Sequence, residues 1–238
     1  MKNIKSVTVA RTAGFCFGVK RAVDKVYSLY GQENVYTYGP IIHNDEVVND
    51  LAEKGIKPLM SLSEASEVPP GTVIIRSHGV GRFEEETLRK AGHRIIDMTC
   101  PFVKKIHEIV DTESQQGRRI IIVGDSSHPE VQGIMGWVHG DPIVIKSEAE
   151  AQNVSLGEEE EGVIVAQTTF HSKKFNNIVE IIEKKRYHIR VINTICSATR
   201  LRQEEAESVS KQADIMFVIG DRRSSNTQKL FDICKTYC

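Results

Sequence analysis

Three cysteines in this 238-residue chain share one local setting. Each of Cys16, Cys100 and Cys196 follows a strand-like segment and precedes a segment with helical periodicity. A thiol at a helix N-terminus is favoured as the thiolate, because the helix dipole places partial positive charge there. Thiolates are the ligands of soft metals and of iron–sulfur clusters. Three such thiols suit three irons of a [4Fe–4S] cube and leave the fourth iron open to substrate.

Spacing alone leaves other interpretations of these thiols open. A zinc site of three cysteines and one histidine is one alternative, although such sites usually contain C-x-x-C pairs and none occurs here. Small buried apolar cysteines are another alternative. Cys234 and Cys238 lie four residues apart near the end of the chain, and we interpret them as core or surface thiols.

Three histidines stand in equivalent places, each next to Gly, Ser, Asn or Pro. His43, His78 and His128 together suggest a polar pocket for an anion, whereas each one alone is compatible with a structural hydrogen bond. Ser224, Ser225 and Asn226 stand at the start of a predicted helix, where hydroxyls and backbone N–H groups capture phosphate. Ordinary N-capping is the alternative for these three residues.

Glu130 follows His128 and Pro129 beside an apolar segment, in what we expect to be a loop. A carboxyl there becomes a proton donor if burial raises its pKa. Thr168 and Thr169 follow another apolar strand, and they are suited to relay that proton or to hold a substrate hydroxyl.

Strands and helices alternate along the chain, which predicts an α/β fold with small, mostly parallel sheets. The polar clusters described above all lie beyond the carboxyl ends of strands, where such folds bind ligands. Strands are expected at residues 6–10, 35–38, 72–76, 94–99, 119–123, 163–166, 187–195 and 215–219. Helices are expected at residues 19–30, 45–54, 83–91, 101–115, 173–185, 197–213 and 227–235.

The cysteine junctions are separated by roughly the size of a small α/β unit. We therefore expect a first unit at residues 17–99 and a second at residues 100–195. A third, incomplete unit combines residues 196–238 with residues 1–16. Residues 61–71 are expected to be a surface connection, and the glutamate run at 158–161 a solvated loop.

Composition excludes several classes of protein. The net charge of −1 offers no bulk electrostatic attraction to nucleic acid or to an anionic membrane. No apolar run is long enough to span a bilayer, and no signal-peptide core is present, so a cytoplasmic location is expected. Phosphate-binding P-loops, dinucleotide fingerprints and nucleophile elbows are absent, which disfavours nucleotide cofactors and serine hydrolysis.

Together these motifs resemble the 4-hydroxy-3-methylbut-2-enyl diphosphate reductase (IspH/LytB) family, in family order over essentially the whole chain. The motifs are residues 13–19 (AGFCFGV), 39–44 (GPIIHN), 76–80 (RSHGV), 97–101 (DMTCP), 128–131 (HPEV), 167–169 (QTT), 193–196 (NTIC) and 224–227 (SSNT).

The resemblance implies the last step of the non-mevalonate isoprenoid pathway. An allylic alcohol diphosphate is reductively dehydroxylated to isopentenyl and dimethylallyl diphosphate with two electrons and two protons. It also implies three α/β units around a [4Fe–4S] cluster whose ligands are Cys16, Cys100 and Cys196. Glu130 is the implied proton source, assisted by Thr168. The implied diphosphate ligands are His43, His78, His128, Ser224, Ser225 and Asn226, and Thr169 is a further candidate for substrate binding.

Reduced ferredoxin or flavodoxin is the expected electron donor, and the family suggests a monomer. Family members continue beyond the position of Cys238 with a further serine-bearing motif, so we expect the third unit and its part of the pocket to be incomplete. Two alternatives use the same three thiols without this reaction: a non-enzymatic iron–sulfur sensor and a zinc-stabilised structural module.

Overall fold

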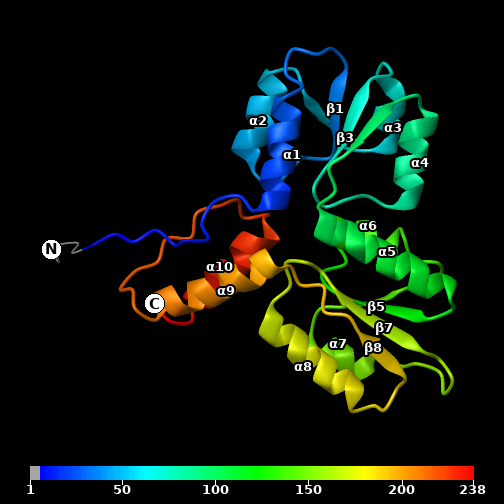
Figure 1. The fold of residues 1–238 in the computed structure, drawn as a ribbon, viewed down its shortest axis with the longest axis vertical. Coiled ribbons are helices and arrows are strands. Elements are labelled where there is room, and N and C mark those ends of the chain that lie inside the picture. Colours follow the sequence, from blue (N-terminus) through cyan, green and yellow to red (C-terminus); the bar gives the residue numbers. More distant parts are fainter. Residues whose placement is uncertain (1–5) are drawn as a thin grey trace.

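The computed structural model describes residues 6–238, which form two parallel sheets and a helical part beside them (Figure 1). The first sheet has the strand order β2-β1-β3-β4, and every neighbouring pair is parallel. Its strands are β1 (Val35–Tyr38), β2 (Lys57–Leu59), β3 (Thr72–Ile75) and β4 (Arg94–Asp97). The expected α/β class with small parallel sheets is therefore confirmed.

Two pairs of helices cover the two faces of this sheet. Helices α1 (Phe17–Tyr27) and α2 (Asp45–Glu53) cover one face, and α3 (Leu62–Glu67) and α4 (Arg82–Lys90) cover the other. Successive residues of a strand point to opposite faces. Accordingly, Ile74 packs in the cluster under α1 and α2, while Val73 packs in the cluster under α3 and α4.

The second sheet repeats this plan with the order β6-β5-β7-β8, again all parallel. Its strands are β5 (Arg119–Val123), β6 (Ile143–Ile145), β7 (Gly162–Ala166) and β8 (Ile189–Val191). Helices α5 (Pro101–Gln115) and α6 (Pro129–Met135) pack on one face, and α7 (Glu148–Asn153) and α8 (Ser172–Glu183) on the other. Strand β7 is buried along its whole length, as a central parallel strand should be.

The third part contains two helices, α9 (Ser197–Ser210) and α10 (Ser225–Cys234), with a small apolar cluster between them. The N-terminal segment lies along α9. The Glu205 carboxylate accepts hydrogen bonds from the backbone N–H groups of Arg11 and Thr12 at 2.7 and 2.8 Å. Arg202 donates to the carbonyl of Gly14 at 2.6 Å.

The predictions of strands at residues 6–10 and 215–219 are wrong. Both segments are extended but unpaired within residues 6–238. One side of the second segment is exposed, with Phe217 84% and Ile219 95% accessible, whereas Met216 and Val218 pack against the cluster between α9 and α10. Alternating apolar residues form a strand only where a neighbouring strand accepts the backbone hydrogen bonds, and no strand of the described residues pairs with them.

Three further local predictions can be compared with the structure. Residues 61–71 are not merely a connection, because α3 lies within them, capped by the Ser61 hydroxyl and anchored by buried Ala65. Glu130 lies in the first turn of α6 and not in a loop. The glutamate run at 158–161 is in a loop, as expected, where Glu160 pairs with Arg119 at 2.7 Å.

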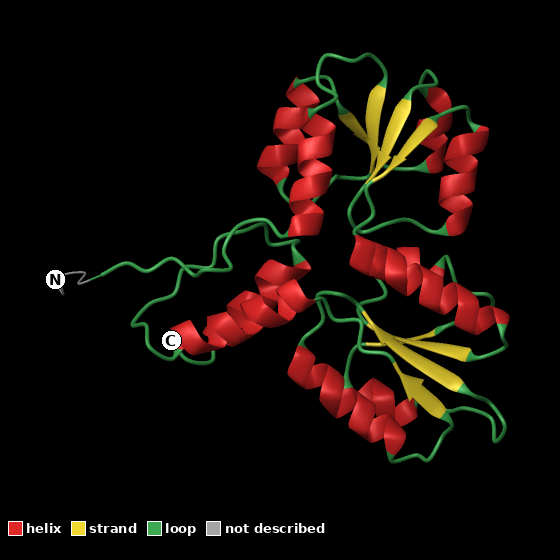
Figure 2. Cartoon of the chain, in the orientation of Figure 1, coloured by secondary structure: helices red, strands yellow, loops and turns green. Residues whose placement is uncertain are grey.

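Figure 2 shows how the parts meet: the N-terminal ends of α1, α5 and α9 point toward a common centre. Two of these helices directly follow sheet strands or their loops, so each sheet delivers one helix start to this centre. Within residues 6–238, no helix is long and apolar enough to cross a membrane.

Candidate active site

Each of the three predicted cysteines is the N-cap residue of one of these helices. Cys16 precedes α1, Cys100 precedes α5 and Cys196 precedes α9, and none caps its helix through a side-chain hydrogen bond. All three thiols are half-buried and free. Burial raises the pKa of the Cys100 thiol, nearby backbone N–H groups lower it, and the charges of Cys16 and Cys196 raise it further. The three thiols are thus close enough to interact electrostatically.

The ligand atoms near the thiols bear on the choice between an iron–sulfur cluster and a single metal ion. A tetrahedral zinc site with sulfur ligands at about 2.3 Å places those sulfurs about 3.8 Å apart. Among residues 6–238, three or more metal-ligating atoms gather within 4.8 Å only in a histidine cluster that includes no thiol. No thiol belongs to that cluster, and three thiols at helix N-termini, where thiolates are favoured, have the donor chemistry of an iron–sulfur group.

Gly18 in the first turn of α1 makes room for one of these thiols. A Cβ atom at this position would lie 2.6 Å from Sγ of Cys100 and 3.1 Å from its Cβ. Real Cβ atoms do not approach a neighbour so closely, so only glycine lets α1 come this near to the start of α5. The local sequence around Cys16 therefore also serves the thiol of Cys100.

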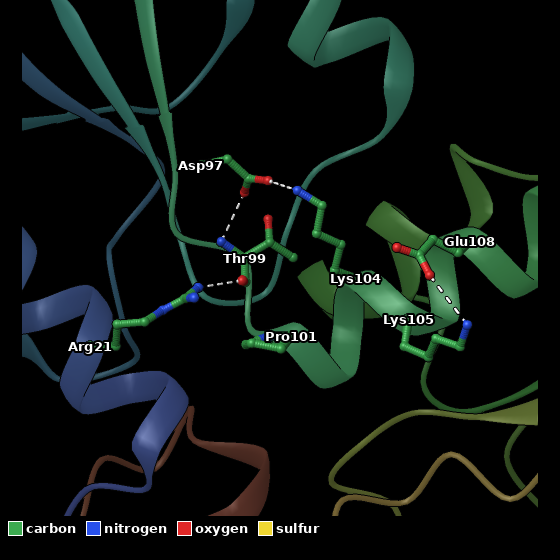
Figure 3. A pocket seen from close by; sticks show the side chains of 7 residues that line it. All are labelled: Arg21, Asp97, Thr99, Pro101, Lys104, Lys105 and Glu108. Atoms are coloured by element: carbon green, nitrogen blue, oxygen red, sulfur yellow. Dashed lines mark hydrogen bonds and ion pairs between the residues drawn. The ribbon is translucent and has the colours of Figure 1, made fainter.

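The backbone on the N-terminal side of Cys100 is held by charged side chains around a hollow of about 260 Å³ (Figure 3). Arg21 of α1 donates to the carbonyl oxygen of Thr99 at 2.6 Å. The Asp97 carboxylate accepts the N–H of Thr99 at 2.9 Å and pairs with Lys104 at 2.7 Å. These contacts join α1, the end of β4 and α5, and fix the direction in which Cys100 points. The hollow is lined by Arg21, Asp97, Thr99, Pro101, Lys104, Lys105 and Glu108.

His43, His78 and His128 come together from three separate segments. Their ring centroids lie 4.8 Å (His43 to His78), 5.3 Å (His78 to His128) and 5.7 Å (His43 to His128) apart. Burial is the largest cause that lowers their pKa values: that of His128 falls to about 4 and that of His78 well below its usual 6.5. The pKa of His43 is also lowered. The histidines are therefore neutral at pH 7.

Ring nitrogens in this cluster lack partners. Nε2 of His43 and Nδ1 of His78 are buried without a hydrogen bond to any described residue. His128 uses Nδ1 to accept the backbone N–H of Glu130 at 3.1 Å, which leaves its Nε2 available. Unpaired buried nitrogens are costly, so this cluster is built to meet a ligand.

The histidine nitrogens are compact enough for a metal ion, but the local charge favours an anion. The charge of Arg76 contributes to the lowered pKa of all three histidines. Lys229 acts in the same direction on His128. Two positive groups beside the cluster repel a divalent cation and attract an anion.

Glu130 is 2% exposed and lies beside this cluster. Burial raises the pKa of its carboxyl, while two donors from Thr168 lower it. The backbone N–H of Thr168 donates to Oε1 at 2.5 Å, and its hydroxyl donates to Oε2 at 2.7 Å. A carboxyl that is buried, raised in pKa and held at both oxygens has the properties of a positioned general acid.

The remaining predicted residues lie at the start of α10 and the end of β7. The hydroxyl of Thr169 donates to Oγ of Ser225 at 3.0 Å, which connects the two segments. Ser224 caps α10 by accepting the N–H of Thr227, so N-capping accounts for its side chain. Asn226 follows in the first helical turn and is half-buried. The structure thus brings the serine cluster next to the Thr168–Thr169 pair.

Sequence reasoning missed three basic residues near this site: Arg21, Arg76 and Lys229. Two of them carried a signal in the sequence. Arg76 directly follows the apolar strand β3, two residues before His78, and Lys229 lies four residues after Ser225 on the same helix face. Arg21 has no such signal, because its role depends on α1 packing against the segment before Cys100.

Comparison with known proteins shows which family contains these features. The model of the family described as "LytB protein" matches residues 7–238. The chain belongs to the LytB family. This confirms the resemblance found in the sequence motifs.

Curated LytB relatives carry the name 4-hydroxy-3-methylbut-2-enyl diphosphate reductase. The protein of Caldanaerobacter subterraneus is 43% identical over 235 residues, covering 98% of this chain and 81% of the relative. That of Thermoanaerobacter sp. is 44% identical over 236 residues, with the same coverage.

Two solved structures of such reductases share the fold. The enzyme from Plasmodium falciparum has a TM-score of 0.88 at 27% identity, covering 94% of this chain and 71% of that one. A second, described as the terminal enzyme of the non-mevalonate pathway, has a TM-score of 0.71 at 40% identity, covering 97% and 82%. The fold predicted from the motifs is therefore that of known reductases.

Proposed function

We propose that this LytB chain converts (E)-4-hydroxy-3-methylbut-2-enyl diphosphate to isopentenyl and dimethylallyl diphosphate. The observation that carries the proposal is the buried Glu130 carboxyl, which Thr168 holds beside three neutral histidines. The same chain brings three thiols at helix N-termini close enough to interact electrostatically. The names of the curated relatives supply the substrate.

In this proposal Cys16, Cys100 and Cys196 hold a [4Fe–4S] cluster through thiolates at the starts of α1, α5 and α9. Bound there, such a cluster would pass on, one at a time, the two electrons that it receives from the external donor, and it would offer Lewis-acid chemistry at the iron without a cysteine ligand. The chain's own contribution is to hold the thiolates rigidly. Arg21 and Gly18 do this for Cys100 through the contacts described above.

The diphosphate group binds at the histidine cluster. His43, His78 and His128 present ring nitrogens from three segments, and Thr169, Ser224, Ser225 and Asn226 add polar groups from the ends of β7 and α10. Anchoring the diphosphate keeps it from acting as the leaving group, so the hydroxyl at the other end of the allylic chain leaves instead.

Glu130 supplies protons in this reaction. The net change is replacement of the hydroxyl by hydrogen with two electrons and two protons, so one proton leaves in water and the other forms the new C–H bond. Burial raises the pKa of Glu130 and so retains a protonated fraction at higher pH. Thr168 fixes both carboxyl oxygens and orients the proton toward the substrate.

The proposal extends to the domain arrangement and the cellular setting of the chain. We infer that residues 17–99, 100–195, and 196–238 with 1–16 act as three units around the cluster. The chain is proposed to work as a cytoplasmic monomer that receives electrons from reduced ferredoxin or flavodoxin. Free thiols at all five cysteines and the lack of a membrane-spanning helix in residues 6–238 agree with this setting.

Turnover under anaerobic conditions tests the proposed function. The full-length protein with its reconstituted cluster should form both products when given the allylic diphosphate and reduced ferredoxin. The variant Glu130→Gln should keep its visible absorption and lose turnover, because its amide cannot donate the proton. Neither a cluster-based sensor nor a zinc module needs this carboxyl. Wild-type turnover that Glu130→Gln leaves intact would contradict the assigned proton source, and no turnover at all would contradict the function.

A further inference from the structure

The histidine cluster does not itself balance the negative charge of a bound diphosphate. A diphosphate carries several negative charges at neutral pH. His43, His78 and His128 are neutral there, because their pKa values are lowered by burial. Neutral donors orient an anion but do not balance its charge, so other groups must do so.

Lys229 of α10 is a half-buried cation at this site. Its ammonium donates to the hydroxyl of Ser225 and lies 5.9 Å from the centre of the Phe170 ring. Its charge acts on both His128 and Glu130, so it lies near both groups. No carboxylate among residues 6–238 lies within ion-pair distance of it, although the charges of Glu130, Asp125 and Asp232 act on it from farther away.

Arg76 is a second buried cation whose charge acts on the same cluster. Its guanidinium lies so close to Gly39 that a Cβ there would be 2.4 Å from one terminal nitrogen. Its Nε is buried without a hydrogen-bond partner, and no described carboxylate lies within ion-pair distance. Tyr38 and Glu84 affect its pKa only from a distance, and burial is the largest cause that lowers it.

We propose that Lys229 and Arg76 are further diphosphate-binding residues that supply the positive charge of the site. The inference rests on the proposed function. Two cations near one cluster, neither in an ion pair with a described carboxylate, lose free energy by burial and regain it when an anion binds beside them. The hydrogen bond from Lys229 to Ser225 also orients that hydroxyl, so the same residue positions one donor and contributes charge.

A metal ion at the three histidines is the competing occupant. Their nitrogens lie within 4.8 Å of one another, as such a site requires. Arg76 and Lys229 oppose it, because both raise the positive potential at those nitrogens. Zn²⁺ alone therefore serves as the comparison probe.

Binding of inorganic diphosphate to the anaerobically reconstituted protein tests the inference by isothermal titration calorimetry. Lys229→Met and Arg76→Met should each raise Kd at least about tenfold, as expected for loss of a charged hydrogen-bond donor. Lys229→Arg should stay within about threefold of wild type. The control Lys235→Met removes the same charge from an exposed position just after α10 and should leave Kd unchanged.

Steady-state kinetics add a second readout that a merely structural role would not move. Both Met variants should raise KM for the allylic diphosphate more than they lower kcat, because the diphosphate is bound equally in the ground and transition states. If differential scanning calorimetry shows that Arg76→Met folds poorly, Arg76→Lys tests the role of the charge in its place. Arg76→Lys should bind diphosphate more tightly than a folded variant with an uncharged residue at position 76.

The outcomes separate this inference from the proposed function. A Kd in Lys229→Met within about twofold of wild type overturns the inference while turnover still supports the reductase. Wild-type protein that turns over substrate without binding inorganic diphosphate, or that binds Zn²⁺ more tightly in place of it, also overturns the inference. Charge-dependent diphosphate binding without turnover would support the anion site and contradict the reductase.

Discussion

Thr168→Val tests how the proton donor is set. The substitution removes the hydroxyl that donates to Oε2 of Glu130 at 2.7 Å and retains the backbone donor to Oε1 at 2.5 Å. Both donors lower the pKa of the carboxyl, against the raising effect of burial. A hydrogen bond to a charged group contributes about 1.5–3 kcal/mol. At 1.36 kcal/mol per pKa unit, losing it should raise the pKa of Glu130 by roughly 1–2 units.

The sign determines the expected pH profile. A proton donor works below its pKa, so the limb on which kcat falls with rising pH should move upward by roughly 1–2 units in Thr168→Val. The profile of kcat for the reconstituted enzyme gives this directly. Infrared difference spectroscopy of the protonated carboxyl against pH gives the same pKa without turnover. The control Thr112→Val changes an exposed threonine on α5 and should leave both curves in place.

An unchanged carboxyl titration in Thr168→Val would refute the reasoning, because the hydrogen bond would then have no effect on Glu130. A shift toward lower pH would refute it more strongly, since it would mean that the hydroxyl stabilises the protonated form.

Three further predictions follow from buried groups. In scanning calorimetry, Glu130→Gln should unfold at a higher temperature than the wild type at pH 8 and at a similar temperature at pH 5. The reason is that burial raises the pKa of Glu130 in the folded state, so the wild type loses stability as pH rises. An equal difference in unfolding temperature at both pH values would contradict this. Gly18→Ala should lower the iron content per chain, because the new Cβ would lie 2.6 Å from Sγ of Cys100. The control Gly157→Ala, whose Cβ would have no neighbour nearer than 3.7 Å, should not lower it. Equal iron contents in the two variants would show that Cys100 moves without consequence. Burial lowers the pKa of His107 from 6.5 to about 4, so the wild type should lose stability as pH falls through that range. His107→Phe should avoid this loss, which amounts to roughly 3 kcal/mol at pH 4 in urea unfolding; parallel curves for the two proteins would contradict the assignment.

The repeated parallel sheets could be predicted because their strands are buried on both faces. Segments such as β5 and β7 are continuous apolar runs bounded by polar loops, and this pattern has few alternatives. The short elements β2, β6, α3, α6 and α7 were missed because three to seven residues carry too little periodicity.

The failed strands at residues 6–10 and 215–219 show the limit of the same reasoning. Ile215, Phe217 and Ile219 have the composition of a strand, but composition does not show whether a neighbour is present. Pairing is a property of the assembled sheet, and within residues 6–238 these segments have no strand beside them.

The candidate site was predictable where a residue type alone indicates chemistry. Cysteines before helices and histidines after strands fall in this class, and so does Glu130. Arg76 and Lys229 were missed because a basic residue is usually solvated, and only the packed structure shows that these two lack a carboxylate partner. The fine positioning of Cys100 by Gly18 and Arg21 likewise depends on how two helices pack.

Mössbauer spectroscopy of the anaerobically reconstituted, iron-57-labelled chain tests the central claim most directly. We expect about four irons per chain, as in a [4Fe–4S] cluster, and a change in the signal of one iron when the allylic diphosphate is added. Three cysteine ligands leave that one iron open beside the histidine pocket. A chain that binds zinc in place of iron, or a cluster whose four irons all ignore the substrate, would contradict the account.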